Sequence, residues 1–210
     1  MDLRNYRQQY NKGDLERDQL DEDPFIQFEK LFTKAKVAGV SEPNAMTLAT
    51  FDEHFGADAR IVLLKEVVRN EFVFFTNYLS SKGQQLTKCP HATLLFWWPQ
   101  SECQIRIRGH VERIDPAESD AYFYSRPHDS KAGAISSQQS CVVEDYDELM
   151  KRFEEIKALP VVELERPEHW GGFAVIPKEF EFWQGRPNRM HDRFLYQLVD
   201  NHWVIKRLSP

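Results

Sequence analysis

The sequence of 210 residues predicts a mainly β protein, an antiparallel barrel or sandwich with peripheral α-helices. Short apolar or alternating runs follow one another and are separated by polar or turn-forming stretches. No helix of crossover length is expected between the early runs, and no GxGxxG motif is present, so a parallel doubly wound sheet is not expected. The early runs that we expect to form strands are Ala45–Phe51, Arg60–Val67, Phe72–Thr76, Ala92–Trp98 and Gln104–Ile114.

The amino-terminal part is expected to contain an arm and one helix. Residues 1–22 are polar and charged, without an apolar stripe, so we expect a mobile arm followed by a single domain over residues 23–210. Asp23 and Pro24 predict a helix start, because aspartate caps helices and proline is favoured at their first position. Gly39 is expected to end this helix in a left-handed cap. Its apolar face would consist of Phe25, Phe28, Leu31, Phe32 and Ala35.

Two further helices and four closing strands are expected in the second half. Asp115 and Pro116 predict a helix that ends before Pro127. A longer helix is expected over Glu144–Leu159, and its apolar face would belong to the core or to a subunit interface. Asp200-Asn201 predicts the turn between the last two strands. The closing strands are expected at Phe173–Ile176, Glu179–Trp183, Phe194–Leu198 and His202–Leu208.

The composition argues against several classes of function. The net charge of −6 comes without a long basic stripe, so general nucleic-acid binding is not expected. Three widely spaced cysteines without a CxxC motif indicate neither a disulfide framework nor a zinc site. The longest apolar run, Ala92–Trp98, is too short to span a bilayer, so we expect no membrane association and a cytoplasmic location. The sequence also lacks the HExxH, GxSxG and P-loop motifs.

A basic loop between two closing strands carries the strongest chemical signal. It contains Arg189, His191 and Arg193, which would project to one side if the stretch were extended. Guanidinium groups bind phosphates in a bidentate manner, and an imidazole titrates near neutral pH. On its own the pattern is also typical of a solvated hairpin tip. The nearby Trp183 and the rest of the chain favour an anionic ligand.

Four other local groups have phosphate-binding chemistry. Arg60 to Lys65 form an apolar run with a cation at each end, which alone is typical of a charged edge strand. Ser80-Ser81-Lys82-Gly83 predicts a helix start at which a lysine would be mildly unfavourable unless an anion lies there. Ser136 to Ser140 are rich in hydroxyls and amides, which is also typical of a surface loop. Tyr122, Arg126 and Ser130, on a helix and the following turn, could surround one phosphate.

Taken together, these residues resemble the pyridoxamine/pyridoxine 5′-phosphate oxidase family, from about Arg7 to Pro210. The family's proteins are FMN-binding split barrels. The most specific segments are Arg60–Lys65, Phe74–Asn77, Ser125–Pro127, Trp170–Phe173, Glu181–Gly185, Arg189–Arg193 and Arg207–Pro210.

The resemblance implies FMN-dependent oxidation of pyridoxamine 5′-phosphate and pyridoxine 5′-phosphate to pyridoxal 5′-phosphate, with O2 reduced to H2O2. It also implies a homodimer with FMN between the subunits. The residues implied to contact FMN are Arg60, Ile61, Val62, Leu63, Leu64, Lys65, Phe75, Thr76, Ser81, Lys82, Gln104, Gln139, Ser140, Trp183 and Arg193.

The resemblance also assigns the vitamin substrate to specific residues. Its phosphate would bind Lys65, Tyr122, Arg126 and Ser130, while Arg189 and His191 would flank the reacting ring. Arg7 and Tyr10 match a mobile segment that can cover the substrate in this family.

This chain departs from the family pattern at two positions. Ser81 stands where the family often has arginine, and one fewer charge-assisted hydrogen bond could weaken FMN binding by roughly ten- to a hundred-fold. Phe75 stands where tyrosine is common, which removes a hydroxyl and keeps the ring.

Two alternative functions remain open. A split-barrel protein could hold FMN or pyridoxal 5′-phosphate without turnover, because fold alone does not imply catalysis. The second set of phosphate-binding residues argues against this carrier. A flavin reductase that uses a nicotinamide would need a dinucleotide motif that the sequence lacks.

Overall fold

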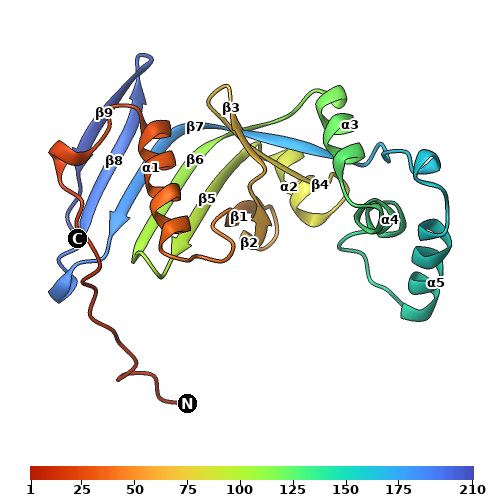
Figure 1. The fold of residues 1–210 in the computed structure, drawn as a ribbon, viewed down its shortest axis with the longest axis horizontal. Helices are drawn as coiled ribbons and strands as arrows, with labels where there is room; N and C mark the ends of the chain where they lie inside the picture. Colours follow the sequence, from red (N-terminus) through yellow and green to blue (C-terminus); the bar gives the residue numbers. More distant parts are fainter.

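The computed structural model describes residues 1–210 and confirms the predicted antiparallel sheet with peripheral helices. The main strand order is β2-β1-β5-β6-β7-β4-β3, and β8 and β9 continue from one half of β7 (Figure 1). The strands are β1 (Ala45–Asp52), β2 (Gly56–Leu63), β3 (Glu66–Val68), β4 (Glu71–Asn77), β5 (His91–Trp98), β6 (Cys103–Arg113), β7 (Trp170–Gln184), β8 (Asp192–Val199) and β9 (His202–Arg207).

Strand β7 divides the sheet into two parts. Its first half pairs with β4 and its second half with β8, while β6 runs along both. The prediction of two separate strands here is wrong, because the chain continues through Pro177 with only a register shift at Arg108 and Gly109 of β6. A Cβ on Gly109 would lie 2.2 Å from the Ile176 carbonyl oxygen, so this crossing requires glycine.

The prediction of one continuous strand over Arg60–Val67 is also wrong. It is interrupted at Leu64 and Lys65, where the backbone changes partners. The Leu64 N–H donates to the Asn44 carbonyl oxygen beside β1, and the Lys65 N–H donates to the Val73 carbonyl oxygen in β4. This interruption turns β2 and β3 toward different neighbours.

Most of the predicted helices are confirmed. The Asp23 carboxylate accepts from the Phe25 N–H at 2.8 Å, and Gly39 takes φ = +82° after the first helix. One helix, α4, was missed, because Ser130 and Ser136 were assigned to a turn and a loop. The helices are η1 (Arg17–Gln19), α1 (Pro24–Val37), α2 (Ser81–Lys88), α3 (Pro116–Ser125), α4 (His128–Ser136), α5 (Tyr146–Lys157), η2 (Val161–Glu163) and η3 (Pro187–Arg189).

An aromatic core lies between α1 and the concave face of the sheet. Phe28 of α1 packs edge-on against Phe72 and Phe96, with ring centroids 5.0 and 5.2 Å away. Leu15 and Leu20, which lie within the expected arm of residues 1–22, are buried in the same core. Their spacing in a polar segment gave no periodic signal.

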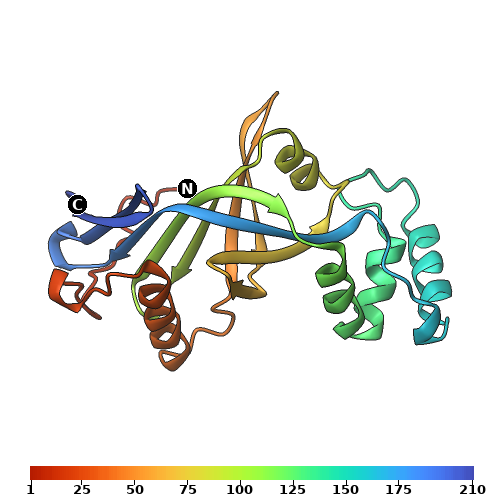
Figure 2. The same cartoon turned by 90° about the horizontal axis from the view of Figure 1, so that it is seen from above.

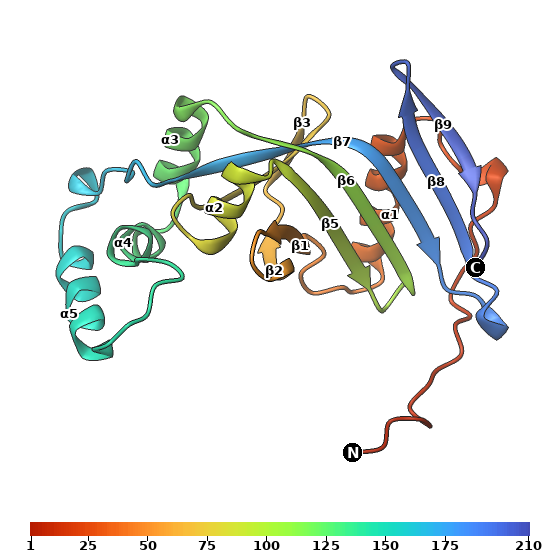
Figure 3. The same cartoon turned by 180° about the vertical axis from the view of Figure 1, so that it is seen from behind.

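The molecule is elongated, with its helices divided between the ends. Helices α3, α4 and α5 form one end, and β8, β9 and both termini lie toward the other (Figures 1 and 2). The view from behind shows the same separation (Figure 3). Helix α5 packs on α4 without burying any residue completely, so its apolar face is not part of the core of this chain. None of the helices is long and apolar enough to cross a membrane.

Candidate active site

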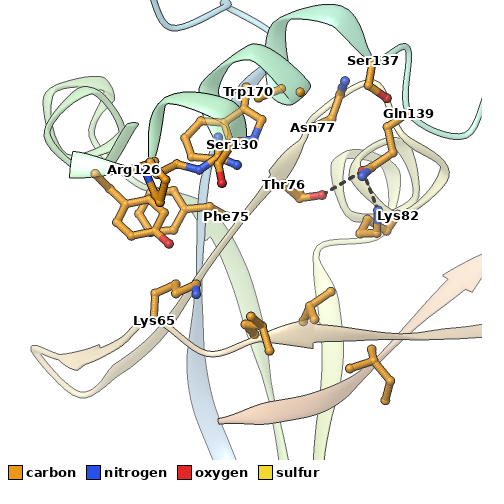
Figure 4. Close-up of a pocket in the computed structure, with 17 residues that line it drawn as sticks. Lys65, Phe75, Thr76, Asn77, Lys82, Arg126, Ser130, Ser137, Gln139 and Trp170 are labelled. Carbon is orange, nitrogen blue, oxygen red and sulfur yellow. Dashed lines mark hydrogen bonds between the residues drawn. The ribbon is translucent and has the colours of Figure 1, made fainter. Parts of the chain in front are cut away.

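A cleft of about 700 Å³ opens between the β2–β4 region and helices α2, α3 and α4. It brings together cationic, hydroxyl and aromatic side chains from segments far apart in the sequence (Figure 4). The predicted site residues that line this cleft are Ile61, Val62, Leu63, Lys65, Phe75, Thr76, Lys82, Tyr122, Arg126, Ser130 and Gln139.

One side of the cleft has the properties of an anion site. Arg126 lies at the end of α3 and is half-buried, yet no carboxylate pairs with it. Its Nη1 is buried without a hydrogen-bond partner, and burial lowers the pKa of its guanidinium. Ser130 lies beside it in the first turn of α4, whose amino terminus has no side-chain cap (Figure 4). Free backbone N–H groups, a hydroxyl and an unpaired cation together favour a phosphate.

Aromatic rings form the wall beside Arg126. Phe75 of β4 stacks on Tyr122 with centroids 3.9 Å apart, and on Trp170 at 5.5 Å. The Arg126 guanidinium lies over the Trp170 ring, 4.6 Å from its centroid. Lys65 is exposed at the mouth of the cleft (Figure 4). The structure thus places Lys65, Tyr122, Arg126 and Ser130 around one cleft.

The opposite side of the cleft is built on the amino terminus of α2. Ser80 caps the helix and accepts from the Gly83 N–H, as the sequence predicted. Lys82 Nζ donates to Gln139 Oε1 at 2.9 Å, and Thr76 Oγ1 donates to the same oxygen at 3.3 Å. Burial and then the neighbouring Arg60 lower the pKa of Lys82. A second anion here would relieve the repulsion between these cations.

Ser81 and Ser140 lie just outside the main cleft. They line a smaller recess of about 190 Å³ that shares Gln139 with it. Ser140 takes φ = +73°, a conformation that is uncommon outside glycine. Both residues therefore line a recess on α2, which begins at Ser81.

Arg60 and Leu64 do not line the cleft in this structure. Arg60 donates to Leu48 and Thr50 of β1, to Gln85 of α2 and to Asp58. Its guanidinium is held beside Lys82 through this network. Leu64 is buried, with 7% of its surface exposed, because it faces the core.

The remaining predicted residues form a second group, around the loop between β7 and β8. Asn188 and Arg189 both take left-handed conformations, with φ of 57° and 65°. The loop is therefore a tight turn at these residues, so the extended conformation that would place all three side chains on one side is not adopted there. Two successive non-glycine residues in this region indicate backbone strain, which is often found at functional sites.

His191 is held in one tautomer. Its Nδ1 accepts from the Arg186 N–H at 3.1 Å, so the neutral ring carries its proton on Nε2. Burial, followed by the charges of Arg189 and Arg193, lowers the pKa of His191 below the ordinary value. The ring packs on Trp183 with centroids 4.6 Å apart. At neutral pH it therefore presents an N–H donor.

The amino-terminal segment covers this second group. Tyr10 packs edge-on against Trp183 at 5.7 Å and lies 5.8 Å from the His191 ring. A Cβ on Gly185 would lie 2.8 Å from Tyr10 Cβ, so glycine permits this close approach. Arg7, Tyr10, Arg189 and His191 line one recess of about 90 Å³.

Arg193 is fixed by a buried carboxylate. Its Nε and Nη2 lie 2.8 and 2.7 Å from Glu181 Oε1, and Arg106 also donates to Glu181. On the neighbouring strands, Gln104 pairs with Trp183, and Trp183 pairs with Arg193. These three predicted residues thus form one row across β6, β7 and β8.

Two buried carboxylates that sequence analysis missed anchor the loop and the arm. Glu102 accepts from the N–H groups of Asn11 and Lys12 at 2.7 and 2.9 Å. Asp192 accepts from the Leu15 N–H at 3.2 Å and from Arg207 at 2.5 Å. Their partners are remote in the sequence, so no local pattern could have identified them.

The predicted site residues therefore form two groups that share no lining residue. The cleft group is Lys65, Phe75, Thr76, Lys82, Tyr122, Arg126, Ser130 and Gln139. The loop group is Arg7, Tyr10, Gln104, Trp183, Arg189, His191 and Arg193. The first lies near α3 and α4 and the second near η3, toward opposite ends of the molecule (Figures 1 and 3).

The residues present fit a phosphorylated flavin. The amino terminus of α2 supplies a positive helix end, and the half-buried Lys82 has an amide as its partner instead of a carboxylate. The cleft also offers apolar and aromatic walls for a planar ring system.

Solved structures define the class of the fold. PhzG from Burkholderia lata, determined with tetrahydrophenazine-1-carboxylic acid, is 28% identical, has a TM-score of 0.89, and covers 95% of this chain and 100% of its own. A pyridoxamine 5′-phosphate oxidase-related, FMN binding protein from Nostoc punctiforme has a TM-score of 0.75 at 15% identity, and covers 91% of this chain and 100% of its own. The fold is therefore that of the FMN-binding split barrels.

Sequence comparisons give the family. Residues 32–159 match the profile described as pyridoxamine 5′-phosphate oxidase, and residues 170–210 match the pyridoxine 5′-phosphate oxidase C-terminal dimerisation region. The chain belongs to the pyridoxamine 5′-phosphate oxidase family, as the sequence indicated.

Two relatives are similar over almost the whole chain, and both are named pyridoxine/pyridoxamine 5′-phosphate oxidase. The protein from Thermosynechococcus vestitus is 50% identical and covers 97% of both chains. The protein from Actinobacillus succinogenes is 46% identical and covers 100% of both chains.

Proposed function

We propose that this chain is an FMN-dependent oxidase that converts pyridoxamine 5′-phosphate and pyridoxine 5′-phosphate to pyridoxal 5′-phosphate. Relatives that are about half identical over nearly its full length carry the name of this activity. The structural observation that carries the proposal is the unpaired, half-buried Arg126 beside the uncapped start of α4. This second anion site goes beyond what a protein that holds only FMN would need.

FMN is assigned to the α2 side of the cleft. Its phosphate would bind Lys82, Ser81 and Ser140, with Arg60 held behind them by its own network. When bound, FMN supplies the redox chemistry, accepting a hydride from the carbon that bears the amine or alcohol and passing the electrons to O2 to give H2O2.

The substrate is assigned to the other side of the same cleft. Lys65, Tyr122, Arg126 and Ser130 would bind its phosphate and thereby fix the distance of its ring from the flavin. The His191 Nε2–H would donate a hydrogen bond to a polar group of the substrate ring. Arg189 would add positive charge on the same side. Arg7 and Tyr10 would close over the bound ring and exclude water.

We further propose that the loop group acts on the cleft of a second copy of this chain. The two groups lie toward opposite ends of one chain, although one reaction needs both (Figures 1 and 3). The members of the loop group between Trp183 and Arg193 also lie within the region that matches the dimerisation profile. A twofold dimer would pair each cleft with the loop of its partner and form two equivalent sites.

The oxidase is tested by anaerobic mixing of the FMN-reconstituted protein with pyridoxamine 5′-phosphate while the flavin absorbance near 450 nm is followed. Bleaching is expected, with recovery and formation of pyridoxal 5′-phosphate when air is admitted. Tight FMN binding without bleaching by either the amine or the alcohol phosphate would contradict the proposal and favour the carrier.

A further inference from the structure

Trp170 lines the cleft and is in contact with Arg126, although it carries no charge of its own. Its ring face lies against the guanidinium, 4.6 Å from the guanidinium carbon to the ring centroid. The Phe123 ring is farther away, with its centroid 5.9 Å from the guanidinium carbon, compared with 4.6 Å for Trp170.

Arg126 lacks the partners that usually fix a guanidinium. No carboxylate pairs with it, and its Nη1 is buried without a hydrogen bond. Elsewhere in the chain the half-buried Arg193 and the nearly buried Arg166 are each held by a carboxylate, at 2.7 and 2.6 Å. A carboxylate beside Arg126 would compete with an incoming phosphate for its donors, whereas an aromatic face leaves these donors free.

The surrounding structure makes Trp170 a rigid support. Its backbone pairs with Asn77 of β4, and its carbonyl oxygen accepts from Arg166 at 2.7 Å. Arg166 is in turn fixed by Asp120 of α3. The indole is nearly parallel to Phe75, with 13° between the ring planes, and only 7% of Trp170 is exposed. The side chain therefore has little freedom to turn away from Arg126.

We propose that Trp170 is a positioning residue, which holds the Arg126 guanidinium by a cation–π contact so that its free donors face the substrate phosphate. This inference rests on the proposed function for the identity of the substrate. The contact itself can be tested with inorganic phosphate, which needs no turnover.

The test compares Trp170→Leu, Trp170→Phe, Arg126→Ala and the double variant in the FMN-reconstituted protein. Trp170→Leu should raise KM for pyridoxamine 5′-phosphate by roughly three- to thirty-fold, which is the range of one cation–π contact, and leave kcat nearly unchanged. Trp170→Phe should recover part of the loss, because a smaller aromatic face remains. In the Arg126→Ala background, Trp170→Leu should cause no further rise in KM.

A matched control separates positioning from general destabilisation. Trp203 packs against Phe25 and Phe180, away from the cleft, so Trp203→Leu should lower the melting temperature without changing KM. Calorimetric titration with inorganic phosphate gives a readout independent of activity, and its Kd should rise in Trp170→Leu as KM does. An unchanged phosphate Kd in Trp170→Leu, or additive effects of Trp170→Leu and Arg126→Ala, would overturn the inference whether or not the protein is an oxidase.

Discussion

Arg189 tests the role of the loop at the scale of a single residue. It is exposed in a strained turn and makes no ion pair within its own chain, so its charge is available to a ligand. Arg189→Leu should lower kcat/KM by roughly ten- to a hundred-fold, the effect of one charge-assisted hydrogen bond, while FMN stays bound. Arg152→Leu, on the exposed face of α5, controls for the loss of one cation. Steady-state kinetics that match wild type in Arg189→Leu would exclude the assigned role.

His191 gives a prediction about pH. Because burial and neighbouring cations lower its pKa in the folded protein, the unfolded chain binds this proton at higher pH than the folded chain does. The contribution of His191 to the free energy of unfolding is therefore complete above its unfolded pKa of about 6.5 and declines as pH falls toward the lowered value. NMR titration of the ring should give a midpoint below that of a model histidine. A midpoint at or above 6.5 would contradict the environment described for His191.

Ser81 gives a prediction about cofactor affinity. It is exposed at the start of α2, in the recess that contains Ser140. Ser81→Arg should lower the Kd of FMN by roughly ten- to a hundred-fold, because it adds one charge-assisted hydrogen bond to the phosphate. Ser81→Met controls for side-chain length. Fluorescence titration of the apoprotein measures both, and equal affinity in wild type and Ser81→Arg would mean that the phosphate does not lie at this helix end.

At the scale of elements, Glu102 tests how the amino-terminal segment is held. Its buried carboxylate accepts from two backbone N–H groups of that segment. Glu102→Gln removes the charge from both hydrogen bonds and should release residues 1–12. The free energy that holds this segment should fall by at most roughly 1.5–3 kcal/mol for each charged hydrogen bond.

Limited proteolysis should then cut this segment faster than in wild type. Glu112→Gln, at an exposed position of β6, the strand that follows Glu102, provides the matched control. Equal cleavage of Glu102→Gln and wild type would show that the carboxylate does not anchor the segment.

The same scale shows which features of the fold could be predicted from the sequence. Caps and alternation are local signals, so α1, α2, α3 and most strands were correctly predicted. Helix α4 begins at His128, its N-cap residue Pro127 supplies no side-chain cap, and it has no marked apolar face, so its signal was weak. The two strands predicted at Phe173–Ile176 and Glu179–Trp183 are one strand, in which Pro177 lies opposite Gly109 at a register shift of β6.

For the candidate site, the functional side chains could be predicted from the sequence, but the residues that support them could not. The functional side chains could be identified because their types and spacing match a family. Their supports could not, because Glu102, Asp192 and Gln85 act through partners remote in the sequence. The division of the site into two groups was likewise a property of the folded chain.

At the scale of the whole molecule, the proposed active site depends on the pairing of two chains. Each chain carries one cleft and one loop group, and the dimerisation region includes the loop. Arg126→Ala damages the cleft, and Arg189→Leu damages the loop. In a mixed dimer of these two variants, one site combines both lesions, and the other combines an intact cleft with an intact loop.

The most direct measurement is therefore turnover of pyridoxamine 5′-phosphate by mixed dimers, purified through a different tag on each variant. Each parental homodimer should be strongly impaired, and the mixed dimer should recover about half of the wild-type rate, because one of its two sites is intact. A mixed dimer no more active than its parents would contradict a site shared between chains.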